Sequence, residues 1–88
     1  MAGGTELKSL LDGNVVTFYD HQTITLPLDD YYKGFNLILM GNAVFVHENT
    51  KRYAHSSHSE DGENRIKLER GWKVTFFQFT QAKLEVIQ

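Results

Sequence analysis

A polar segment in the second half of the chain, His55–Asn64, carries two histidines and three acidic residues, and four of these residues form the best candidate for a metal site. They are His55, His58, Asp61 and Glu63. Imidazole and carboxylate groups are suitable ligands for zinc or iron. The spacing fixes no further protein ligand, however, and a charge-rich run of this kind is typical of a solvated surface loop. His55 and His58 are therefore weak metal candidates. We predict no metal and no other cofactor, and we expect this loop to be the most mobile part of the chain.

A second group of residues has the composition of a carbohydrate-binding site. Aromatic rings with polar tips stack on sugars, and carboxylate or amide groups bind their hydroxyls. The candidates are Tyr31, Tyr32, Tyr53 and Trp72 for stacking, with Asp29, Asp30 and Asn49 for hydrogen bonds. Protein interfaces favour the same residue types. The alternative is that Trp72 closes one end of the core and that the tyrosines line a contact with another protein chain.

Two pairs of adjacent carboxylates provide the minimum chemistry for glycoside hydrolysis. They are Asp29–Asp30 and Glu60–Asp61. Neighbouring residues in a strand or loop point in different directions, so neither pair is a catalytic dyad by itself, although a pair formed across the fold stays open. The sequence contains no nucleophile elbow, phosphate-binding loop or catalytic-triad signature. We therefore expect a protein that is not an enzyme.

These side chains must be positioned by short strands. The densest apolar run, Lys73–Thr80, has apolar residues on both faces and predicts a central strand buried on two sides. Gly41–Asn42 is a hairpin dipeptide, which predicts a turn between a strand at Phe35–Met40 and a second strand at Ala43–His47.

The other expected elements are also short. One or two helical turns are predicted at Thr5–Leu11, with Thr5 as N-cap and Asp12–Gly13 as the end. Strands are predicted at Asn14–Tyr19, Thr23–Leu26, Lys51–Ala54, Arg65–Leu68 and Leu84–Ile87. Seven or eight short strands predict a small antiparallel all-β sandwich or jelly-roll-like barrel. Residues 1–13 form an N-terminal extension of this single domain, and residues 14–88 form the β module.

The apolar positions of these strands predict the core. We expect burial of Ile24, Leu26, Leu37, Leu39, Val44, Val46, Val74, Phe76, Phe77 and Val86. An 88-residue domain buries only a modest share of its surface. Since two predicted strands are apolar on both faces, the surplus is most simply buried against identical chains, and we expect self-association.

The charge balance bears on possible partners. The net charge is −2, which gives no basic stripe for nucleic acid, and no apolar run reaches the roughly 20 residues of a membrane span. We therefore expect no nucleic-acid partner and no membrane insertion. The chain contains no cysteine, so no disulfide reinforces it.

The order of the expected strands resembles small β-domains of bacteriophage tail fibres, tail spikes and related receptor-binding proteins. The likeness rests on Thr23–Pro27 (T-I-T-L-P), Gly34–Val46, Asp61–Gly62, Ile66-x-Leu68 followed by Gly71-x-x-Val74, and Leu84–Ile87. The resemblance implies a virion structural module of the phage tail, soluble when expressed alone, that forms a homotrimer and either spaces a fibre or contacts a host receptor. The partners that it implies are identical chains, together with a host-surface glycan or other tail proteins.

Two other functions stay open. The first is a small soluble inhibitor or regulatory protein, monomeric or dimeric, that binds a partner protein. The second is a fragment of a glycan-degrading tail spike. The molar mass in solution separates a trimer of the 10.1 kDa chain from a monomer.

Overall fold

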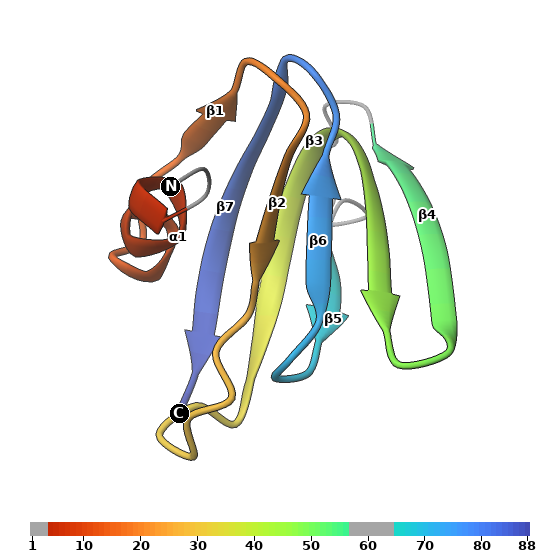
Figure 1. Cartoon of the computed structure of the whole chain (residues 1–88). Coiled ribbons are helices and arrows are strands. Elements are labelled where there is room, and N and C mark those ends of the chain that lie inside the picture. The colour runs from red at the N-terminus through yellow and green to blue at the C-terminus, as the bar shows by residue number, and fades with distance from the viewer. Residues whose placement is uncertain (1–3, 57–64) are drawn as a thin grey trace.

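The computed structural model describes residues 4–56 and 65–88, with the backbone alone at residues 55 and 56. This part of the chain forms one helix and seven strands (Figure 1). The elements are α1 (Gly4–Leu11), β1 (Val16–Phe18), β2 (Gln22–Thr25), β3 (Gly34–His47), β4 (Thr50–Ser56), β5 (Arg65–Leu68), β6 (Lys73–Phe76) and β7 (Thr80–Ile87). The fold is small, antiparallel and all-β with a short N-terminal helix, as predicted.

The strand β3 is the centre of the sheet, because it pairs with four other strands. Its first half, residues 34–40, pairs with β7 and β5, and its second half, residues 41–47, pairs with β4 and β6. The path through the sheet runs β1-β7-β3-β6-β2. In Figure 1 the first half of β3 rises and the second half descends, so the sheet curls around a core.

The predicted hairpin at Gly41–Asn42 is wrong, because these residues form a bend inside one continuous strand. The two halves of β3 pair with other strands and not with each other. The bend needs glycine, since Gly41 has φ +138° and a Cβ added there would lie 2.5 Å from the Thr80 Oγ1 atom. The Thr80 hydroxyl accepts a hydrogen bond from the Asn42 N–H and donates one to the Asn42 carbonyl, both at 3.1 Å.

The predicted central strand at Lys73–Thr80 is also wrong. The strand β6 ends at Phe76, residues 77–79 form a turn, and Thr80 begins β7. The Phe79 backbone takes a left-handed conformation, with φ +63°, which strand geometry does not allow. Phe77 and Phe79 therefore do not form a second buried face: Phe77 is half-buried and Phe79 is exposed.

The core lies inside the curled sheet and includes six of the ten predicted residues. Those buried as predicted are Ile24, Leu26, Leu37, Leu39, Val74 and Phe76. The other four, Val44, Val46, Phe77 and Val86, are half-buried. In β3 the inward positions next to Val44 and Val46 belong to Ala43 and Phe45, which are fully buried. Phe18 was not predicted, yet its ring stacks on Phe76 with 4.0 Å between centroids.

The helix α1 packs against β7, β2 and β1. Leu10 is completely buried, and Leu7 and Leu11 pack against the core, as their spacing predicts. Gly13 ends the helix with φ +87°, and the bonds from the Gly13 N–H to the Leu10 carbonyl and from the Asn14 N–H to the Ser9 carbonyl complete a Schellman motif. The prediction of Thr5 as the N-cap is wrong, because α1 begins at Gly4 and Thr5 lies inside its first turn. Within residues 4–56 and 65–88, no helix has the length and apolar character needed to cross a membrane.

Candidate binding surfaces

The structure does not bring the predicted site residues together. Trp72 lies in the core at 9% exposure. Its indole ring stacks on the His47 imidazole with 5.1 Å between ring centroids. Almost no face of Trp72 is left for a sugar. Asn49 lies in the turn between β3 and β4, and Tyr53 lies on β4.

Four of the predicted residues share the loop between β2 and β3, where they mainly support the loop itself. Asp29 accepts a hydrogen bond of 2.9 Å from the Tyr31 N–H. The Asp30 carboxylate forms an ion pair with the Arg70 guanidinium, with 2.6 Å between oxygen and nitrogen. Tyr31 meets Tyr32 edge to face with 5.1 Å between ring centroids. The two carboxylates have different partners, so Asp29 and Asp30 do not form a catalytic pair.

The weak metal candidates fall outside what the structure describes. His55 belongs to β4 opposite Asn42, but its side chain is not described. His58, with the rest of residues 57–64 and the Glu60–Asp61 pair, also lies outside the described residues. The His55–Asn64 loop, predicted to be the most mobile, lies there too except for its first two residues, which belong to β4. Elsewhere, within the described residues, no three His, Asp or Glu side chains are grouped as metal ligands.

The outer face of the sheet carries a row of aromatic side chains. The His21 and Phe77 rings lie 5.0 Å apart, and the Phe77 and Tyr53 rings lie 5.9 Å apart. The Tyr53 hydroxyl, on a side chain that is 61% exposed, donates a hydrogen bond of 2.6 Å to the Asn42 Oδ1 atom. His21 precedes β2, Phe77 follows β6 and Tyr53 lies on β4, so the row crosses several strands.

The strand register places a second row of side chains on the same face, and this row ends at Tyr53. Thr23 pairs with Thr75, Thr75 pairs with Val44, and Val44 pairs with Tyr53. Residues directly opposite in antiparallel strands project from the same face. The Thr23 and Thr75 hydroxyls share a hydrogen bond of 2.8 Å. This face therefore combines aromatic, aliphatic and hydroxyl groups.

Phe79 is the most unusual residue near this row. Its side chain is 68% exposed, and its backbone has φ +63°. Its ring meets Tyr19 edge to face with 6.5 Å between centroids. The ring row consists of His21, Phe77 and Tyr53, and Phe79 is joined to it through the turn that it shares with Phe77. We define the aromatic surface as His21, Tyr53, Phe77 and Phe79.

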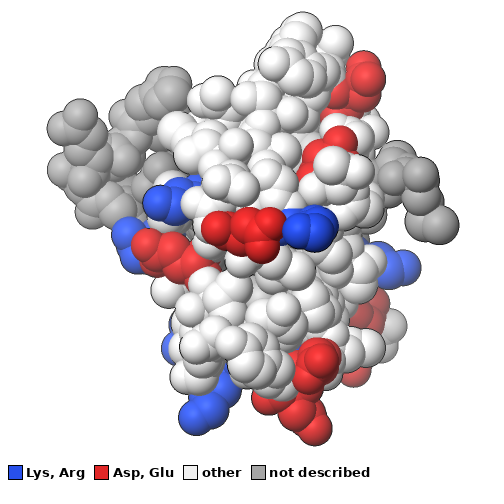
Figure 2. All heavy atoms as spheres, turned by 90° about the vertical axis from the view of Figure 1, so that its left-hand side faces the viewer, with Lys and Arg blue, Asp and Glu red and all other residues white. Residues whose placement is uncertain are grey.

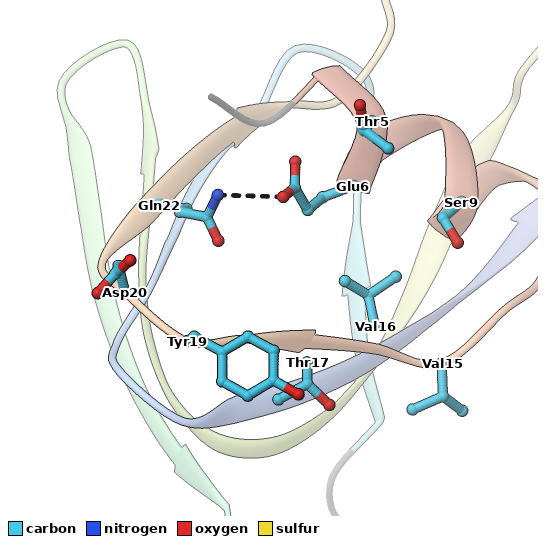
Figure 3. A pocket seen from close by; sticks show the side chains of 9 residues that line it. All are labelled: Thr5, Glu6, Ser9, Val15, Val16, Thr17, Tyr19, Asp20 and Gln22. Atoms are coloured by element: carbon cyan, nitrogen blue, oxygen red, sulfur yellow. Dashed lines mark hydrogen bonds between the residues drawn. The ribbon is translucent and has the colours of Figure 1, made fainter. Parts of the chain in front are cut away.

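A cleft of about 530 Å³ opens where β1 and β2 are joined (Figure 3). Side chains of α1, of β1 and of the turn that follows β1 surround it, and Tyr19 and Gln22 belong to its wall. The Gln22 amide donates a hydrogen bond of 3.2 Å to the Glu6 carboxylate across the cleft. No sequence pattern indicates this cleft, because it depends on how α1 lies against two strands.

The side of the molecule that carries α1 and β1 is mostly uncharged (Figure 2). Acidic and basic side chains are scattered over it with both signs intermixed, so the described residues in this view form no large field of one sign. Local contacts, and not a long-range electrostatic field, must therefore decide what binds there.

Comparisons with protein-family models, with curated proteins and with solved structures give no match to this chain.

Proposed function

We propose that the chain is a non-enzymatic binding and assembly module of a phage tail fibre or receptor-binding protein. It works in the virion as a homotrimer and contacts a host-surface glycan through the aromatic surface. The resemblance of the strand sequences supports the virion setting, and the exposed rings support the binding role.

Phe79 is the observation that carries the binding role. A left-handed backbone costs a non-glycine residue roughly 1–2 kcal/mol, and glycine would avoid that cost. At 68% exposure the Phe79 ring gains little from burial. Strained residues of this kind gather at functional sites. We therefore infer that the ring is kept for a contact outside the chain.

The chemistry of the surrounding groups favours a sugar as the ligand. The rings of Tyr53 and Phe77 offer apolar faces to sugar C–H groups. The Thr23 and Thr75 hydroxyls and the Asn42 amide lie on or beside the same face and can exchange hydrogen bonds with sugar hydroxyls.

Binding to a panel of immobilised bacterial surface polysaccharides tests this role. Tyr53→Ala and Phe77→Ala should each weaken binding about tenfold or more, because a stacking ring is lost. Tyr31→Ala is the matched control, since Tyr31 is equally exposed at 61% but belongs to the loop before β3. Equal loss in all three variants, or no loss in the first two, would remove the aromatic surface as the glycan site.

The trimer needs a separate test. Light scattering over a hundredfold dilution should give a mass near three times 10.1 kDa. A monomer at every concentration would contradict the trimer and the fibre setting. The second candidate function, a small inhibitor or regulator that binds a partner protein, would then lead, and the cleft beside β1 supports it.

A further inference from the structure

We propose that the cleft beside β1 binds an extended peptide segment of a partner protein, which adds as a strand to the free edge of β1 and carries a lysine or arginine. This goes beyond the glycan contact, because it concerns a different class of ligand and a site that only adjoins the aromatic surface, where Tyr19 meets Phe79.

The first step is that β1 has a free edge. The strands β1 and β2 are separated by only three residues, yet β1 pairs with β7 and β2 pairs with β6. They form the two ends of the path through the sheet. Among the described residues, no backbone hydrogen bond joins β1 to β2. Free edges of this kind accept additional strands.

The second step is the direction of the edge groups. The Phe18 carbonyl accepts a hydrogen bond of 2.7 Å from the Phe79 N–H. The backbone groups of Phe18 therefore point toward β7. Neighbouring residues in a strand direct their backbone groups to opposite sides. The N–H and C=O of Thr17 therefore point to the open side, where an added strand would find one donor and one acceptor.

The third step is that there is room along this edge. The cleft of about 530 Å³ is lined by β1 residues 16 and 17, by the turn at residues 19 and 20, and by α1. In Figure 3 the side chains from α1 lie across the cleft from Tyr19. This volume falls in the range of ligand sites, about 300–1,000 Å³.

The fourth step is the charge of the lining. Glu6 and Asp20 contribute two carboxylates, and no lysine or arginine lines the cleft. Glu6 already accepts the hydrogen bond from Gln22, which holds that carboxylate at the wall of the cleft. A positively charged side chain on the peptide complements these groups. Main-chain bonds to a strand edge with a side-chain pocket beside it are the features of peptide recognition by strand addition.

The test uses two labelled octapeptides of alternating Thr and Val, one with a central lysine and one with a central glutamate. The lysine peptide should bind at least tenfold more tightly than the glutamate peptide, and added salt should reduce the difference. The Thr17 amide should shift in NMR spectra during the titration. If neither peptide binds at millimolar concentration, the proposal is overturned.

A pair of substitutions at Thr17 tests the strand edge. Thr17→Pro removes the N–H on the open side and leaves the ladder to β7, since proline is tolerated on edge strands. It should weaken binding of the lysine peptide about tenfold. Thr17→Val keeps the N–H and loses only the side-chain hydroxyl, so binding should change less than threefold. Equal effects of both substitutions would contradict strand addition.

A second pair tests the charge and does not depend on whether Thr17→Pro folds. Asp20→Lys should reverse the preference, so that the glutamate peptide binds more tightly than the lysine peptide. Glu69→Lys changes the net charge by the same amount outside the cleft and should leave the preference unchanged. An unchanged preference in Asp20→Lys would overturn the proposal.

Discussion

The bend in the middle of β3 predicts a large loss of stability for Gly41→Ala. The added Cβ would lie 2.5 Å from Thr80 Oγ1 and 2.9 Å from Thr80 Cβ. Thr80 cannot easily move away, because it is buried and its hydroxyl holds both backbone groups of Asn42. The substitution also places a Cβ on a backbone with φ +138°.

The expected loss follows from these contacts. Inserting an atom into a packed site costs about 1–3 kcal/mol, and a left-handed backbone adds roughly 1–2 kcal/mol. We expect a decrease in the free energy of unfolding on the order of 2–5 kcal/mol. A domain of this size has only about 5–15 kcal/mol in total. The melting temperature should fall by about 8 °C or more.

Gly13→Ala is the matched control for this prediction. Gly13 also has positive φ, at +87°, but a Cβ added there meets nothing within 4 Å. Its free energy of unfolding should fall only by the cost of a left-handed backbone with a Cβ, about 1–2 kcal/mol. Urea titrations of both variants give the difference between their free energies of unfolding, and this difference isolates the contact with Thr80. If Gly41→Ala is no less stable than Gly13→Ala, the close approach of β3 and Thr80 is refuted.

Three other predictions concern stability and are checked by urea or thermal unfolding. Phe76→Ala removes the ring stacked on Phe18 and should cost about 3–5 kcal/mol, so a melting temperature within a few degrees of wild type would count against it. Thr80→Val leaves the N–H and C=O of Asn42 without the hydroxyl and should cost about 1–3 kcal/mol, whereas an unchanged stability would mean that these bonds contribute nothing. Leu10→Ala removes the buried anchor of α1 and should cost about 2–5 kcal/mol, and a smaller effect would show that the helix does not contribute to the core.

Local patterns were sufficient for much of the fold. The strand at Arg65–Leu68 has the predicted bounds. Alternation of apolar residues in β2 identified Ile24 as core, and the spacing of Leu7, Leu10 and Leu11 identified the inner face of the helix. In each case the pattern lies within one element, where burial sets the period directly.

The bend at Gly41–Asn42 could not be predicted, because a glycine turn has the same local signature in a hairpin and in a bent strand. The residue that decides between them, Thr80, lies 38 positions from Asn42. The error at Lys73–Thr80 has a similar cause. The turn with the left-handed Phe79 divides the apolar run between two strands, and no residue pattern indicates that turn.

The predicted site residues lie on separate parts of the fold. Of that set, only Tyr53 belongs to the aromatic surface. His21 and Phe77 join it because the register brings β2, β6 and β4 to one face, which no sequence spacing shows. Trp72 has the residue type of a sugar platform, but its position beside His47 places it in the core.

The most direct test of the central claim is a paired measurement on Phe79→Gly. The stability of this variant and its binding to the polysaccharide recognised by the wild type are measured on the same preparation. Because glycine relieves the strain at φ +63° and the exposed ring contributes little burial, the free energy of unfolding should stay unchanged or rise by up to about 1 kcal/mol. Binding should fall at least tenfold. A variant that binds as the wild type does, or that loses more than about 2 kcal/mol of stability, would contradict the claim that Phe79 is kept for binding.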